Sequence, residues 1–114
     1  MIKREYHDYL QDIINSIGEI ERFIEGYDFN QFFKDRKTVN AVIRSLEVIG
    51  EASKKIPVDV REKYPLIPWK KMGGMRDKLI HEYSGVDEEI VWKVATEEIP
   101  PLKSQIEKIL KENV

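Results

Sequence analysis

The spacing of the apolar residues is the strongest constraint on the fold. They recur at steps of three and four along several long segments of the chain. This spacing collects apolar side chains on one face of an α-helix, whereas a half-buried strand alternates them every second residue. No segment shows the alternating pattern. The sequence therefore predicts an all-α fold, an up-and-down bundle of four main helices with short helical turns between them.

Turn-forming residues mark the ends of the predicted helices in the first half of the chain. Gly26 ends a first helix over residues 6–24, and the polar segment 27–36 is expected to form a short helical turn or loop. Asp35 is placed to cap a second long helix. That helix ends before Pro57, because proline cannot donate the next backbone hydrogen bond.

The middle of the chain is predicted to contain one short helix and the third main helix. The short helix covers about residues 58–63, and residues 64–74 follow as a connector in which Trp69 is the large apolar anchor. Residues 75–83 are good helix formers, and Gly85 offers a stop just after them. The third main helix is therefore expected to begin after the connector.

The last predicted helix contains a pair of prolines. Asp87 is placed to cap it, and its apolar residues continue to Leu110. Pro100 and Pro101 each remove a backbone donor, so we expect them to bend it. Residues 1–114 then form a single domain, because a chain of 114 residues can bury one core but is too short for two.

The composition excludes several classes of protein. Apolar residues make up 41% of the chain and charged residues 35%, which suits a packed helical domain and not a disordered one. The absence of cysteine removes disulfides, thiol nucleophiles and cysteine-bound metals. No apolar run approaches the roughly 18 to 20 residues of a membrane span, and the charges near the first residue do not fit a signal peptide. We expect a cytoplasmic protein without a membrane segment.

Charge is distributed unevenly along the chain. The formal net charge of −2 and the pI of 5.8 argue against a broad basic surface that coats nucleic acid. Between Trp69 and His81, however, four cations oppose a single acid, Asp77. These cations are Lys70, Lys71, Arg76 and Lys78. A focused site for an anionic ligand is therefore compatible with the acidic average.

Arg76 and His81 are the candidate catalytic residues in this basic segment. RNA can be cleaved without a metal if one group takes the 2′-hydroxyl proton and a fixed cation stabilises the charge that builds on phosphorus. Imidazole titrates near neutral pH, and guanidinium stays charged and matches phosphate oxygens. On an ideal helix a five-residue step places the two residues roughly 140° apart. Either the geometry relaxes near the helix end, or a second subunit completes a shared cleft.

Three further features lie beside this pair. Asp77 precedes His81 by four residues, a spacing at which it would hold the imidazole in one tautomer, although a simple surface ion pair fits equally well. Tyr83 adds a phenol nearby. The Gly73–Gly74 pair, expected before the helix, allows close approach of a backbone or ligand, but a plain turn explains it as well.

The stretch Arg76-Asp77-x3-His81-x-Tyr83 resembles the motif of the HEPN superfamily in its HepT-like form, which ends His-x-Tyr. The similarity extends beyond the motif to nearly the whole chain. The segments that resemble the HepT-like branch are YLQDIINSIGEIERFIEG, AVIRSLEVIGEA, IPWKKMGGMRDKLIHEYSGVDEEIVWKV and IPPLKSQIEKIL.

This resemblance implies a helical bundle that forms a homodimer, with both copies of the motif lining a cleft that cleaves RNA. The activity implied is that of a toxin, a metal-independent endoribonuclease without cofactors. Arg76 would bind and polarise the scissile phosphate, His81 would act as general base or acid, and Asp77 would support it. The implied partner is a minimal nucleotidyltransferase antitoxin, which would silence the toxin by attaching AMP to Tyr83.

Two readings without catalysis remain open. One is a HEPN module that binds a nucleotide or serves as the partner of a nucleotidyltransferase, and the other is a purely structural homodimer. A short nucleotidyltransferase in the adjacent reading frame would favour the toxin or the partner module. On the second helix, Arg44, Glu47 and Glu51 share a face, and we interpret them as a structural ion-pair ladder and not as part of the site.

Overall fold

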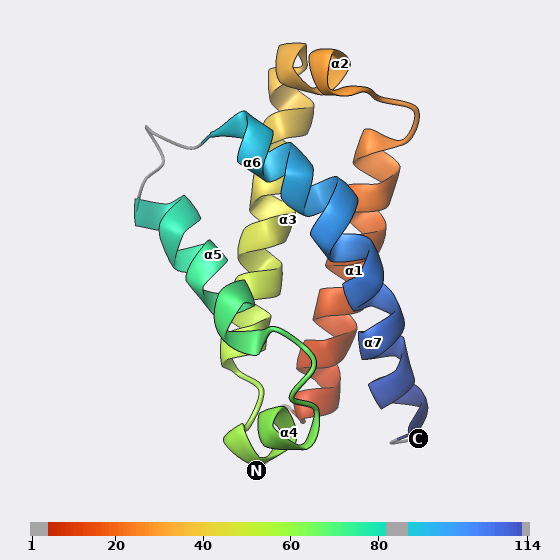
Figure 1. The fold of residues 1–114 in the computed structure, drawn as a ribbon, viewed down its shortest axis with the longest axis vertical. Helices are drawn as coiled ribbons and strands as arrows, with labels where there is room; N and C mark the ends of the chain where they lie inside the picture. The colour runs from red at the N-terminus through yellow and green to blue at the C-terminus, as the bar shows by residue number, and fades with distance from the viewer. Residues whose placement is uncertain (1–4, 82–86, 113–114) are drawn as a thin grey trace.

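The computed structural model describes residues 5–81 and 87–112, and it describes residues 76–81 by their backbone alone. Within these ranges the chain forms helices and no strand. In chain order the elements are α1 (Tyr6–Ile24), α2 (Phe29–Lys34), α3 (Arg36–Lys54), α4 (Val58–Lys63), α5 (Trp69–His81), α6 (Glu88–Lys93), the π-helical turn η2 (Val94–Glu98) and α7 (Ile99–Glu112). Figure 1 shows α1, α3, α5 and the α6–α7 rod side by side, with α2 at one end and α4 at the other. The predicted all-α bundle is confirmed.

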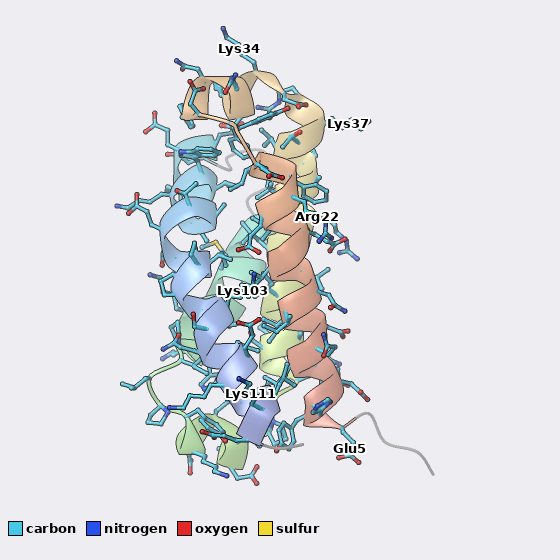
Figure 2. The ribbon with its side chains drawn as sticks, turned by 90° about the vertical axis from the view of Figure 1, so that its right-hand side faces the viewer. Glu5, Arg22, Lys34, Lys37, Lys103 and Lys111 are labelled. Atoms are coloured by element: carbon cyan, nitrogen blue, oxygen red, sulfur yellow. The ribbon has the colours of Figure 1, made fainter. Side chains whose placement is uncertain are left out.

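α1 and α3 form the centre of the bundle, and α7 packs against α1. The core side chains with no exposed surface are Leu10, Ile13, Ile17, Ile20, Phe32, Val39, Val42 and Ile106. At the surface, Lys103 of α7 reaches across to Glu21 of α1, with 2.9 Å between Nζ and Oε1 (Figure 2). None of the described helices combines the length and hydropathy needed to cross a membrane.

The connection between α1 and α3 follows its predicted signals. Of the described residues only Gly26 has a positive φ, 77°, a conformation that is inexpensive for glycine alone and that ends α1. Asp35 caps α3, because its carboxylate accepts from the Thr38 backbone N–H at 3.1 Å and from the Thr38 hydroxyl at 2.7 Å. It also accepts from the Tyr27 hydroxyl at 2.6 Å. These hydrogen bonds, that of Tyr27 first, lower the pKa of Asp35 to about 2.

The prediction of a connector over residues 64–74 is wrong in its second half. α5 begins at Trp69, so Gly73 and Gly74 lie inside the helix and make no turn. Pro68 starts the helix, since its carbonyl accepts from the Met72 N–H at 3.0 Å. The predicted apolar anchor is confirmed: Trp69 is 7% exposed, and its indole N–H donates to the Tyr64 carbonyl at 3.0 Å.

A wider, π-helical turn precedes the prolines of the last rod, and the bend predicted at this point stays a prediction. In an α-helix the amides of residues 100 and 101 would donate to the carbonyls of Thr96 and Glu97, but prolines have no N–H to give. The chain forms the π-helical turn η2 at this point, and the Ile99 N–H reaches back five residues to the carbonyl of Val94. The rod thus continues through the proline pair, which lies in the first turn of α7, where a helix tolerates residues without an N–H.

Candidate active site

The candidate catalytic residues lie in the last two turns of α5. Arg76, Asp77 and His81 have helical backbone, and α5 ends at His81. The predicted modification site, Tyr83, and the other residues of 82–86 lie outside the described residues. Asp77 and His81 are four residues apart on this helix and share a face. Because the helix continues to His81, Arg76 is displaced from it by about 140° around the axis.

α5 lies at the edge of the bundle, where it packs mainly on α3 and runs antiparallel to it (Figure 1). The two helices approach closely at Gly73, where a Cβ atom would lie 3.2 Å from Cγ of Lys54. α3 has small buried residues, Gly50 and Ser53, in the same part of its length. Glycine at position 73 therefore permits the close packing that places α5 against α3.

This contact fixes which residues of α3 lie level with the candidate site. Both helices rise about 1.5 Å per residue in opposite directions. Counting from the contact of Gly73 with Lys54 brings Arg76 level with Glu51, and His81 to about the level of Glu47. The sequence analysis interprets both glutamates as part of a structural ion-pair ladder, and the approach of the two helices carries no local signal. The bundle brings two carboxylates of α3 to the height of the candidate residues.

A small apolar cavity of about 40 Å³ lies between α3, α5 and the last rod. Ligand pockets usually measure about 300 to 1,000 Å³, so this cavity is a gap in packing and not a nucleotide site. Among the residues around it are Leu46, Met72, Met75 and Leu102, together with Lys71 and Glu98, which form an ion pair. The ion pair joins α5 to the last rod.

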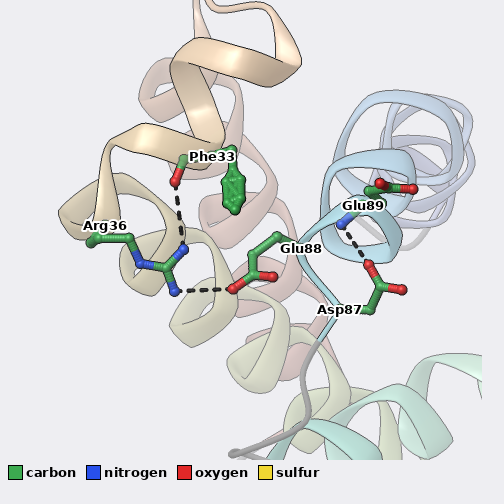
Figure 3. A network of polar contacts seen from close by, with 5 residues as sticks. All are labelled: Phe33, Arg36, Asp87, Glu88 and Glu89. Carbon is green, nitrogen blue, oxygen red and sulfur yellow. Dashed lines mark hydrogen bonds and ion pairs between the residues drawn. The ribbon is translucent and has the colours of Figure 1, made fainter.

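The chain on the far side of residues 82–86 is fixed at the start of α6 (Figure 3). The Arg36 guanidinium of α3 pairs with the Glu88 carboxylate at 3.0 Å and also contacts the Phe33 carbonyl at 3.5 Å. Asp87 caps α6, as predicted, by accepting from the Glu89 N–H at 2.8 Å. Both ends of the segment that contains Tyr83 are therefore tied to α3, one through α5 and the other through this ion pair.

Aromatic rings reinforce the same end of the bundle. Phe32 of α2 is fully buried, and its ring centroid lies 5.0 Å from that of Trp92 in α6. Phe29 makes edge contacts with Phe33 at 5.9 Å and with Trp92 at 6.4 Å. Phe33 itself is 43% exposed. These rings hold α6 against α2, so they support the position of the chain that follows the candidate site.

Comparison with known proteins points to one family. Residues 13–109 match the family model described as ribonuclease HepT-like. The chain is 52% identical over 110 residues to a protein of Thermococcus cleftensis named "Probable ribonuclease HepT", covering 96% of this chain and 100% of the relative. It is 51% identical over 112 residues to a "Putative RNase" of Methanocaldococcus jannaschii, covering 98% and 97%. A "Putative RNase" of Caldanaerobacter subterraneus is 45% identical over 102 residues, covering 90% and 91%. No solved structure matches the chain.

Proposed function

The chain belongs to the HepT-like ribonuclease family, and we propose that it is a metal-independent endoribonuclease, the toxin of a toxin–antitoxin pair that acts on cytoplasmic RNA. The observation that carries this proposal is the motif of Arg76, Asp77, His81 and Tyr83, which falls inside the segment that matches the family and whose first three residues lie in α5. Relatives of about half identity over nearly the whole chain bear ribonuclease names.

The proposed reaction uses the 2′-hydroxyl of the RNA as its nucleophile. His81 accepts the proton of this hydroxyl while its oxygen attacks the neighbouring phosphorus. The bond from phosphorus to the 5′-oxygen breaks, and that oxygen leaves with the proton that His81 now carries as an imidazolium. Arg76 stabilises the negative charge on the phosphate oxygens, and Asp77, on the face of His81, orients the imidazole. The products are a 2′,3′-cyclic phosphate and a 5′-hydroxyl end.

We propose that the working site is shared by two copies of the chain. Arg76 and His81 lie on different faces of one α5, so a single helix does not present both to one phosphate. In a homodimer with two-fold symmetry, α5 of each copy can face the other across a cleft, and the arginine of one copy then meets the histidine of its partner. Dimerisation is therefore part of the proposed catalysis.

The proposed partner is a minimal nucleotidyltransferase that acts as antitoxin. Transfer of AMP to the Tyr83 hydroxyl would add a bulky anionic group two residues from His81. Such a group would repel the RNA phosphate and fill the cleft. This gives a chemical reason for silencing through tyrosine, the residue that completes the motif.

A second candidate is a non-catalytic module that binds a nucleotide or the nucleotidyltransferase. The binding module is favoured by the separation of Arg76 from His81 around α5, because one helix does not place the two residues on the same face. This candidate predicts binding to the nucleotidyltransferase that is unaffected by alanine at either position, and no cleavage of RNA.

Incubation of the purified protein with total RNA in EDTA tests the proposal. Wild type should cut the RNA, and Arg76→Ala and His81→Ala should lower the rate, by about 100- to 10,000-fold for the histidine. His7→Ala and Arg22→Ala, which change the same residue types on α1, are matched controls and should cut like wild type. Intact RNA in every lane, from protein shown to be folded and dimeric, would overturn the proposal in favour of the binding module.

A further inference from the structure

A broad groove at the N-terminal end of α5 lies outside the candidate site. It has a volume of about 860 Å³ and runs between α4 and the first turn of α5. Among its described lining residues, three cations stand against one acid, Glu62. The cations are Arg61 from α4 and Lys70 and Lys71 from α5. The groove is thus a basic depression within a protein of net charge −2.

Two of these cations keep their charge available to a ligand. Arg61 donates through Nε to the Ile56 carbonyl at 3.1 Å, a neutral partner that orients the guanidinium without cancelling its charge. Lys70 is exposed. Lys71 forms the ion pair with Glu98, so we count its contribution as largely neutralised. With Lys71 offset by Glu98, Arg61 and Lys70 outweigh the one acid of the lining, Glu62, and leave the groove with an excess of one positive charge.

The position of the lysines works against the stability of α5 itself. The first turn of a helix carries a partial positive charge that favours acids and disfavours cations. The first turn of α5 has no acid and holds Lys70 as well as Lys71, whose charge the ion pair with Glu98 already offsets. Residues that break a local rule in this way commonly serve a function at that place. An anionic ligand in the groove would offset the repulsion.

The groove is connected to the candidate site by α5. Lys70 and His81 are eleven residues apart on the helix, which corresponds to about 17 Å of rise. A stacked strand with one phosphate per roughly 3.4 Å would cover this length with about five phosphates. A second groove of about 700 Å³ lies between α1 and α7 and has Lys108, Lys111 and Glu107 in its lining, but it does not involve α5.

We infer that the α4–α5 groove binds the phosphate backbone of single-stranded RNA several nucleotides away from the cut. This inference rests on the proposed function and adds a second contact to it. The groove anchors the strand through Arg61 and Lys70 by charge and without reading bases, since phosphate contacts position a strand but do not select its sequence. Long RNA gains affinity from the groove, and RNA too short to reach it does not.

Binding is measured with the full chain in the His81→Ala background, with a labelled 20-nucleotide RNA over a series of salt concentrations. Arg61→Gln/Lys70→Gln should weaken binding about tenfold and reduce the slope of log K against log salt by about 1.4, about 0.7 for each lost phosphate contact. Lys108→Gln/Lys111→Gln removes the same charge from the α1–α7 groove and should change neither. If the double variant fails to fold, the single variant Lys70→Glu, at an exposed position, replaces it.

Cleavage separates this inference from the proposed function. With active protein, the Arg61→Gln/Lys70→Gln variant should lose kcat/KM on the 20-nucleotide RNA and keep it on a four-nucleotide RNA. Equal RNA affinities and equal salt dependences of the two double variants would overturn the inference that the α4–α5 groove binds RNA, whether or not wild type cuts RNA. If RNA binding depends on the α4–α5 groove but the wild-type protein cuts no RNA, the inference about the groove stands and the proposed nuclease activity is overturned.

Discussion

Mixing two inactive variants tests whether the catalytic site is shared between subunits. An Arg76→Ala chain keeps His81, and a His81→Ala chain keeps Arg76. If each site takes its arginine from one copy and its histidine from the other, a mixed dimer contains one complete site and one site that lacks both residues. Neither variant is expected to cut RNA alone, but their mixture should.

The helical geometry of α5 gives the size of the effect. At an outer radius of about 5.5 Å, a step of 140° and about 7.5 Å of rise separates the two positions by roughly 13 Å. Each contact to the reacting phosphate requires a hydrogen-bond distance of about 3 Å, so this separation favours a site in which the second group comes from another copy. Random exchange of equal amounts makes about half of the dimers mixed, each with one of two sites active, and the expected rate is about a quarter of wild type.

The assay follows cleavage of a quenched fluorescent RNA in EDTA after the two variants have exchanged subunits. Differently tagged chains and native mass spectrometry confirm that mixed dimers form. A mixture of Arg76→Ala with the double variant Arg76→Ala/His81→Ala is the control, because no pairing of these chains completes a site. If mixed dimers are present and the rate does not rise above that of the separate variants, the shared site is refuted.

Three further predictions concern stability. Phe32→Ala should lower the free energy of unfolding by about 3 to 5 kcal/mol and the melting temperature by roughly 12 to 20 °C, because Phe32 is fully buried. Phe33→Ala, at the next position but 43% exposed, should lower the free energy of unfolding by about 1 kcal/mol. Equal losses for the two variants in calorimetry would contradict the packing described. Gly74→Ala should stabilise the protein by about 0.5 to 1 kcal/mol in urea unfolding, because a Cβ there meets nothing within 4 Å; a loss would show that α5 is not helical at that point. The pKa of Asp35 is about 2 against an ordinary 3.8, so its carboxylate contributes stability that is present above pH 3.8 and lost as the pH falls toward 2. Tyr27→Phe should raise the titration midpoint of Asp35 measured by NMR and make the loss of stability toward pH 2 smaller. An unchanged midpoint would remove Tyr27 as the main cause.

The helices that follow local signals were predictable from the sequence. The apolar spacing gave α1 and α3, and the short polar residues Asp35 and Asp87 marked the starts of α3 and α6. Such caps act over three or four residues, so the local sequence is sufficient to predict where these helices begin. The start of α5 was missed because two glycines in a row indicate a turn. In the bundle both glycines are helical, and Gly73 serves close packing against α3, which is a tertiary requirement.

The candidate site was predictable as a set of residues but not as an arrangement. Residue types and spacing singled out Arg76, Asp77 and His81, because these groups suit proton transfer beside a phosphate. The level of Glu47 and Glu51 relative to the candidate residues depends on how far α5 is shifted along α3, a quantity that no local pattern encodes. The basic groove likewise joins α4 to α5, and only the fold brings Arg61 beside Lys70.

The contacts of Asp35 and Arg36, neighbours in the chain, differ in how soon they can form during folding. The Tyr27–Asp35 hydrogen bond spans eight residues, so it closes a short loop and joins α1 to α3 at little entropic cost. The Arg36–Glu88 pair spans 52 residues and forms only after the intervening chain has been brought together. The bundle should therefore nucleate at the α1–α3 hairpin and recruit α6 last. In native-state hydrogen exchange α6 should open before α1 and α3, so the helix that follows the candidate motif is the last to assemble and the first to be released.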